Sequence, residues 1–391
     1  PPPEGREGPP WLHIDWRESG VEMPESGAQA DGQGRELIER ALPYQLKATT
    51  ALAFGADGVR QLKLMGLEAV ELVRRRVEEF QIDCDLTWGY CDLANKPAHM
   101  EGFAEDKAEL ESLGYRHELR LLPKERIHEV VGSDNYHGAM IDMGSGHLHP
   151  LNLCLGEAKA AESLGALIFE HSEVLDIVHG PRPAVVTTGG RIEAKQVLLA
   201  GDVYHKLERK QLKGMIFPAM GGIVTTAPLG AELIEAINPF DLAVYDCRFV
   251  LDYYRLTGDG RLLFGGGANY SGRDSRDIAG ELRPCIERTF PQLKGVQIDF
   301  QWSCAMGIVM NRIPQLGKLS SNVWYCQGYS GHGVATTHIM GEIMAKAITG
   351  DLEQFDTFAA CKHIKVPLGD QLGNPMLAAG MWYYQMLEKL R

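Results

Sequence analysis

The stretch 323–345 constrains the fold of this chain more than any other. The apolar run 323–325 predicts a β-strand, and Gly328, Gly331 and Gly333 then allow a sharp turn. Beyond the turn, apolar residues recur at helical spacing. The first amides of such a helix have no partner within it and carry the positive end of its dipole, so an electron-rich group is stabilised there. The alternative is an ordinary turn before a surface helix.

Length and composition narrow the class of protein. A chain of 391 residues predicts two domains, and 45% apolar with 23% charged residues is typical of globular proteins. The net charge of -13 disfavours nucleic acid or an anionic membrane as the main partner, whereas a cationic amine is tolerated. Eight cysteines without a C-x-x-C pair predict a cytoplasmic protein and no metal site. We expect no membrane insertion and no secretory leader.

The N-terminal residues 1–45 form an atypical segment. Prolines, glycines and polar residues dominate it, which is a composition that buries little apolar surface. Within it, Leu12, Ile14 and Trp16 alternate with polar residues, and this pattern fits either a short strand or a disordered arm.

The remaining chain alternates helical and strand patterns. Helical spacing is present at 36–80, 102–113, 124–131, 151–163 and 278–290. Strands are predicted at 167–170, 174–179, 184–188, 197–200, 221–227, 249–256, 262–266 and 296–302. The run 197–200 predicts a buried parallel strand that ends in a tight turn at Gly201.

Four separated motifs occur in an order that points to one family. They are Gly146-His147-Leu148-His149-Pro150-Leu151, the strand end 197–201, the pair 251–257 and 262–267, and Trp302 with 312–317 ahead of the glycine turn 328–333. In this order they resemble the D-amino acid oxidase-like FAD-dependent oxidoreductases. Within that family the chain is most similar to members that oxidise gamma-glutamylated polyamines, and the resemblance runs from about residue 54 to the C-terminus.

The resemblance implies an α/β fold in which an FAD/NAD(P)-binding-like domain is interleaved with an antiparallel-sheet substrate domain. The FAD-type domain would comprise 46–80, 141–215 and 305–391, and the substrate domain 81–140 and 216–304. It also implies FAD as cofactor and oxidation of an amine C–N bond to an imine, which hydrolyses to an aldehyde and ammonia. Oxygen or another acceptor would take the electrons, and oxygen would give hydrogen peroxide.

The chain departs from the family pattern at its start. The family's first strand runs into G-x-G-x-x-G, which seats the pyrophosphate of the cofactor on a helix end. Residues 1–50 contain no apolar run followed by these glycines. We therefore expect the first β–α–β unit to be absent and FAD to be held less tightly. An incomplete subunit, a non-catalytic scaffold or a chain that depends on a partner subunit or homo-oligomer is the alternative to a self-sufficient enzyme.

The family pattern selects candidate site residues. The catalytic candidates are Tyr253, Tyr254 and His332, and the substrate candidates are His147, His149 and Arg255. The cofactor candidates are Val174, Ala200, Gly201, Arg312, Gly328, Gly331, His332, Gly333 and Val334.

Several of these candidates have a plainer alternative. Because Tyr253 and Tyr254 alternate on a strand, one should face the substrate and the other the core or solvent, and the sequence does not say which. Arg255 fits a substrate carboxylate or a surface ion pair. His147 and His149 could equally be surface or capping groups.

Overall fold

The computed structural model describes residues 58–366 except 249, and beyond these residues 369, 373–376, 378–380, 383 and 386. All of them belong to one compact unit, Thr49–Arg391. The alternating run at Leu12, Ile14 and Trp16, which fits a strand or a disordered arm, lies outside the described residues, as does the first β–α–β unit that is predicted to be absent. Among the residues described, no helix combines the length and apolar character needed to cross a membrane.

The largest sheet in the described chain has eight strands in the order β12-β8-β11-β10-β9-β1-β3-β2. Their bounds are β1 Thr87–Leu93, β2 Leu119–Pro123, β3 Gly138–His147, β8 Phe217–Thr226, β9 Ala243–Asp246, β10 Tyr253–Leu256, β11 Leu262–Asn269 and β12 Ile298–Ile308. Every neighbouring pair is antiparallel except β1 and β9, which are parallel. The predicted antiparallel sheet is therefore confirmed, with one parallel pair inside it.

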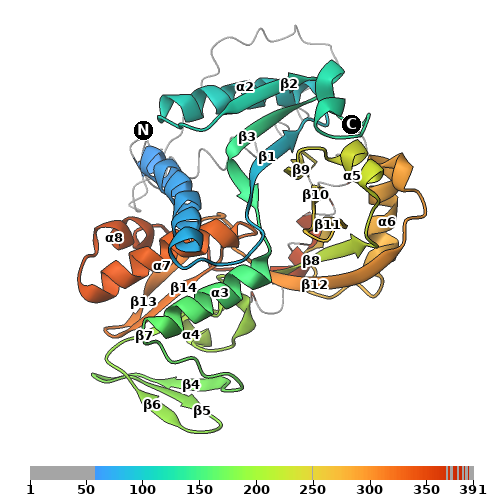
Figure 1. Ribbon diagram of the computed structural model, residues 1–391. Coiled ribbons are helices and arrows are strands. Elements are labelled where there is room, and N and C mark those ends of the chain that lie inside the picture. The colour runs from blue at the N-terminus through green and yellow to red at the C-terminus, as the bar shows by residue number, and fades with distance from the viewer. Residues whose placement is uncertain are drawn as a thin grey trace, which may run out of the picture. The chain divides into compact units, whose positions relative to one another are not determined.

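One face of this sheet is buried under helices. The helix α6 (Ile278–Thr289) packs against β8 and β11 (Figure 1). Its buried residues Ile278, Leu282 and Ile286 follow the helical repeat, and Asp277 caps its start by accepting a hydrogen bond from Gly280 N. The same core takes in α5 (Ala231–Ile237) and the 3-10 turns η1 (Lys124–Glu129) and η3 (Pro291–Leu293).

Helix α2 (Pro97–Ser112) packs near the other end of the sheet, beside β2 and β3 (Figure 1). Its buried Phe103 forms a small cluster with Ala94 and Met140. The residue Met140 is the cross-strand partner of Asp92, so α2 covers the sheet face on which Asp92 lies.

A second sheet, with the order β13-β14-β7, carries the glycine turn. Its strands are β7 Val197–Leu199, β13 Gln315–Ser320 and β14 Val323–Gln327, and β7 runs parallel to β14 as predicted. Behind them lie α7 (Gly333–Thr349), α8 (Glu353–Ala359) and a helical segment at 58–79. Ala69 and Leu72 pack there with Ile339 and Ile343 of α7. The predicted strand, glycine turn and helix are thus confirmed.

The third sheet is a meander of β4 (Val174–Val178), β5 (Ala184–Thr187) and β6 (Arg191–Glu193). Helix α3 (Pro150–Ser163) precedes it, and η2 (Asp202–Tyr204) and α4 (Arg209–Leu212) follow β7.

The strand predicted at 167–170 is wrong. The residues there form no strand, and Leu167 and Phe169 are 80% and 62% exposed. A strand needs a neighbour for its backbone groups, and no strand of the described chain pairs with this run. The mixed α/β fold as a whole agrees with the prediction, whereas the domain boundaries stay a prediction.

Candidate functional site

The turn after β14 requires glycine at two positions. Gly328 has φ +81° and Gly331 has φ +96°, in the left-handed region that disfavours side chains. A Cβ on Gly328 would also lie 2.5 Å from Val309 Cγ1, whereas one on Gly331 would meet nothing within 4 Å. Gly328 is therefore needed for packing, and Gly331 leaves the turn open on its outer side.

The start of α7 is open to a ligand. His332 is its N-cap and makes no side-chain capping bond, so no side chain in the described part of the chain closes this helix end. His332 and Val334 are exposed, and Gly333 is half-buried. Uncapped amides at the positive end of the helix dipole can stabilise negative charge on a bound group.

The end of β7 lies at the same edge as this turn. Because β7 and β14 are parallel, their carboxyl ends meet there, and Ala200 and Gly201 follow β7 as exposed residues. Asp202 fixes the arrangement, since its Oδ1 accepts a hydrogen bond of 2.7 Å from Gly328 N. The structure thus brings together the predicted residues Ala200, Gly201 and Gly328, while Asp202 was missed although it directly follows the predicted strand end.

A second set of contacts joins the turn to the large sheet. Ser330 N donates to Gly307 O at the end of β12, and Ser330 Oγ accepts from Val309 N at 3.2 Å. Gly307 has to be glycine because a Cβ there would lie 2.3 Å from Asp202 Oδ2. Nearby, the exposed Arg312 has φ +59° and its N donates to Val309 O. These residues hold the end of β12 against the glycine turn.

Tyr253 lies on the sheet face opposite the core. Its ring covers Gly265, where a Cβ would come within 2.2 Å of ring carbon Cζ. Its hydroxyl lies 4.0 Å from the Cβ position of Gly221, and Met306 Cε lies 3.2 Å from the same position. Tyr253 is therefore close to the end of β12 that meets the turn, and burial raises the pKa of its hydroxyl to about 12.

The next two residues of β10, Tyr254 and Arg255, point to opposite faces of the sheet. Tyr254 is 2% exposed and packs with Phe264 and Phe290 in the core. Arg255 shares the face of Tyr253, is half-buried, and donates from Nη1 to Leu256 O at 2.7 Å. Burial lowers the pKa of Arg255, against the attraction of Asp241 and Asp85. Of the two tyrosines, only Tyr253 stays in our proposed site.

His147, at the end of β3, and His149, before α3, are both engaged in local structure. His147 Nε2 lies 2.7 Å from Asp241 O, and its side chain is 7% exposed. His149 caps α3 by accepting a hydrogen bond from Asn152 N at 3.3 Å. We therefore leave both out of the proposed substrate contacts.

Val174 begins β4, where it is half-buried and packs with a cluster that includes Ile177, Val197 and Leu199. Its suggested place beside the adenosine of FAD stays a prediction.

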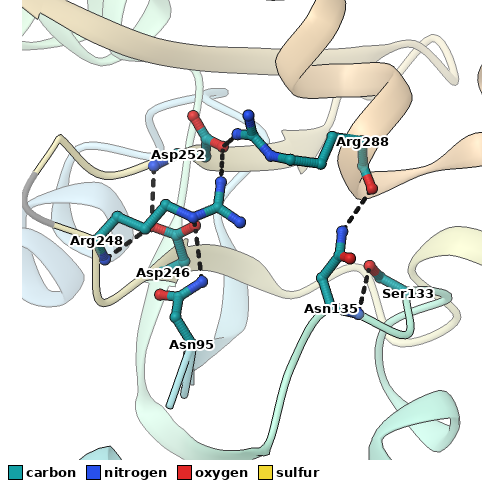
Figure 2. Close-up of polar contacts among 7 residues, drawn as sticks. All are labelled: Asn95, Ser133, Asn135, Asp246, Arg248, Asp252 and Arg288. Atoms are coloured by element: carbon teal, nitrogen blue, oxygen red, sulfur yellow. Dashed lines mark hydrogen bonds and ion pairs between the residues drawn. The ribbon is translucent and has the colours of Figure 1, made fainter. Parts of the chain in front are cut away.

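An ionic cluster around two buried carboxylates fixes the loop that joins β9 to β10. Figure 2 shows Arg248 between Asp246 and Asp252, and Arg288 of α6 reaching Asp252 from the other side. Asp246 Oδ1 also accepts from the backbone amides of Arg248 and Asp252, and Asn95 donates to Oδ2. This cluster, the hairpin brace, sets the separation of Tyr245 at the end of β9 and Tyr253 at the start of β10.

Comparison with known proteins identifies the family. The family of FAD-dependent oxidoreductases called DAO matches residues 15–347. The chain belongs to this family. Gamma-glutamylputrescine oxidoreductase of Escherichia coli K12 is 40% identical over 340 residues, which are 86% of this chain and 79% of that protein. Glycine oxidase of Bacillus subtilis is 22% identical over 249 residues, or 61% of this chain and 63% of that protein.

Solved structures of the same fold are similar to this FAD-dependent oxidoreductase. L-proline dehydrogenase of P. horikoshii has a TM-score of 0.64 at 22% identity and covers 73% of this chain and 78% of its own. Glycine oxidase of Geobacillus kaustophilus has a TM-score of 0.63 at 19% identity, with 81% and 84% covered. The family match begins at residue 15, well before residue 54, where the resemblance read from the motifs began.

The described residues of this FAD-dependent oxidoreductase suit the flavin-ring end of FAD. The helix end is uncapped, Gly331 is open, and the exposed strand end at Ala200 lies at the same edge. At the pyrophosphate end, the sequence offers no G-x-G-x-x-G.

Replacing Gly328 by alanine is expected to weaken FAD binding at least tenfold and to lower the stability by about 1–3 kcal/mol. The reason is that a Cβ would be placed at a positive φ and against Val309 Cγ1. Fluorescence titration with FAD and chemical denaturation measure the two effects. Gly295→Ala is the control, since it has φ +71° with no atom within 4 Å and lies away from the turn. Equal FAD affinity of the two variants would contradict the role given to Gly328.

Proposed function

We propose that this chain uses FAD to oxidise the C–N bond of a gamma-glutamylated polyamine or a related amine. The product imine hydrolyses to an aldehyde and ammonia, and oxygen yields hydrogen peroxide. The observation that carries the proposal is the open start of α7 behind Gly328 and Gly331, at the carboxyl edge of β7 and β14. The substrate class is supported by the 40% identity to gamma-glutamylputrescine oxidoreductase.

Different residues of the chain would have different roles in the reaction. When bound, FAD supplies the acceptor for the electrons of the C–N bond. The amides from Gly333 onward, with the helix dipole, would stabilise negative charge next to His332. Tyr253 would contact the substrate, and Arg255, two residues further on the same face, suits the free carboxylate of a gamma-glutamyl group. The net charge of -13 favours the approach of a cationic amine.

The purified full-length chain is expected to take up FAD and to release peroxide with gamma-glutamylputrescine. Flavin absorbance after incubation with FAD tests the first step, and a coupled peroxide assay tests the second. The missing G-x-G-x-x-G favours one competing function, a scaffold that cannot hold FAD alone. If no FAD is bound after incubation, the result supports the scaffold function. If FAD is bound and a different amine is turned over, only the proposed identity of the substrate is contradicted.

A further inference from the structure

A row of polar residues continues from Tyr253 across the neighbouring strands. Tyr253 on β10 is the cross-strand partner of Tyr245 on β9, and Tyr245 is the partner of Asp92 on β1. Paired residues of adjacent strands point to the same face, and the strands are about 4.8 Å apart. Tyr245 and Asp92 therefore extend the face of Tyr253, and the core takes the residues of the opposite face, such as Val244 and Tyr254.

Asp92 is an unusual residue on this face because it is a buried acidic side chain. It is 6% exposed, and its Oδ1 is buried with no hydrogen-bond partner in the described part of the chain. Burial raises the pKa of Asp92 to about 7, the interaction with Tyr245 opposes that rise, and Asp106 and Asp142 add to it. A carboxylate in this setting can accept a proton near neutral pH.

Tyr245 lies between Asp92 and Tyr253 on this face of the sheet. Tyr245 is the cross-strand partner of Asp92 and interacts electrostatically with its carboxyl group, and the Tyr90 and Tyr245 ring centroids lie 5.4 Å apart. Burial raises the pKa of both tyrosines, so each stays a neutral phenol. The thiol of Cys247 also lies near Asp92, and burial raises the pKa of this thiol to about 12. A neutral phenol can accept a proton on its oxygen while it donates its own hydroxyl proton to another group, so it can relay a proton.

We propose that Tyr245 and Asp92 remove the proton that the substrate ammonium has to lose before its C–N bond is oxidised. One substrate N–H bond breaks and its proton goes to Tyr245 Oη, while the proton of that hydroxyl goes to the carboxylate of Asp92. The amine is left neutral with its electron pair free, Tyr245 is unchanged, and Asp92 becomes a carboxylic acid. Asp92 acts through Tyr245 and is a positioning residue. The inference rests on the proposed function, because it requires an amine substrate.

The first test observes the proton without turnover. The probe is gamma-glutamylputrescine with two methyl groups on the carbon that carries the amine, which has no hydrogen to lose in oxidation. Infrared difference spectra of the FAD-loaded full chain at pH 8.5 are expected to gain a carboxylic-acid C=O band when the probe binds. Asp92→Asn and Tyr245→Phe should lack this band. Tyr115→Phe is the matched control, since Tyr115 donates to Asp142, a neighbouring buried carboxylate, at 2.6 Å.

The second test is the pH profile of kcat/KM for gamma-glutamylputrescine. Between pH 7.5 and 9 the wild type should be nearly flat, because the protein deprotonates the bound ammonium. The Asp92→Asn variant can use only the substrate molecules whose amine is already neutral in solution. That fraction rises about tenfold per pH unit below the amine pKa near 10.4, so kcat/KM of the variant should rise in the same way. At pH 7.5 its kcat/KM should be about 10²- to 10⁴-fold below wild type.

The two tests separate this inference from the proposed function. A wild type whose flavin is reduced by gamma-glutamylputrescine, but which gains no carboxylic-acid band with the probe, overturns the proton route alone. The same conclusion follows if Asp92→Asn keeps the flat profile. A wild type whose bound flavin is not reduced by any amine overturns the proposed function and the proton route with it.

Discussion

Replacing Arg248 by methionine is expected to lower the free energy of unfolding by about 3–5 kcal/mol. The side chains of Asp246 and Asp252 are 0% and 4% exposed, and Arg248 is the cation that both share. Its loss leaves Asp246 as a buried carboxylate whose remaining hydrogen bonds within the described chain come from Asn95 and two backbone amides. Burial already raises the pKa of Asp246, and Arg248 opposes that rise. Chemical denaturation at pH 7.5 measures the loss.

The matched control is Arg126→Met, which breaks an ion pair with Glu129 at the surface. Arg126 is 54% exposed and makes two hydrogen bonds to Glu129, so its loss should cost far less stability than the loss of Arg248. Arg248→Lys keeps the charge without the planar fork and should fall between the two. If Arg248→Met and Arg126→Met cost the same, the hairpin brace does not hold the β9–β10 loop.

Replacing Asp92 by asparagine is expected to improve stability relative to the wild type as the pH rises. Well below its unfolded pKa of 3.8, the carboxyl is protonated in the folded and unfolded states alike. Burial raises its folded pKa from 3.8 to about 7, so between these values the folded state holds a proton that the unfolded state has lost, and wild-type stability falls with pH. Each pH unit is worth about 1.36 kcal/mol, which makes the difference between pH 4 and pH 8 about 4 kcal/mol in favour of Asp92→Asn.

Urea denaturation of both proteins across this pH range, without FAD, measures the difference. Asp259→Asn is the control, because the Asp259 side chain is 62% exposed and hydrogen bonds from Thr257 and Arg261 lower its pKa. Its effect should be small and opposite in sign. A difference between Asp92→Asn and wild type that does not change with pH would show that Asp92 is ionised in the folded protein throughout this range.

The sequence was most informative where local rules decide the structure. The turn at Gly328 and Gly331 could be predicted because a positive φ and a close approach both demand glycine. The strand at 167–170 was predicted from its apolar β-branched composition, yet pairing is a tertiary property that the run itself does not contain.

The site residues divide in the same way. The sequence predicted that Tyr253 and Tyr254 point to opposite faces of a strand. Which of the two faces the core depends on the packing of the sheet, which the sequence does not give. Asp92 was missed altogether. An acidic residue in an apolar run was the available signal, and its importance arises only because β9 places Tyr245 beside it.

The hairpin brace also bears on which changes of chain length this protein can tolerate. Tyr245 and Tyr253 lie on two strands joined by the short loop that the brace fixes. A single-residue insertion there would shift the register of β10 and exchange the faces of Tyr253 and Tyr254. The turn between β4 and β5 carries no such constraint, since its residues are largely exposed and no proposed site residue follows it on β5. Natural variation in length should therefore be found in that turn and be excluded from the β9–β10 loop.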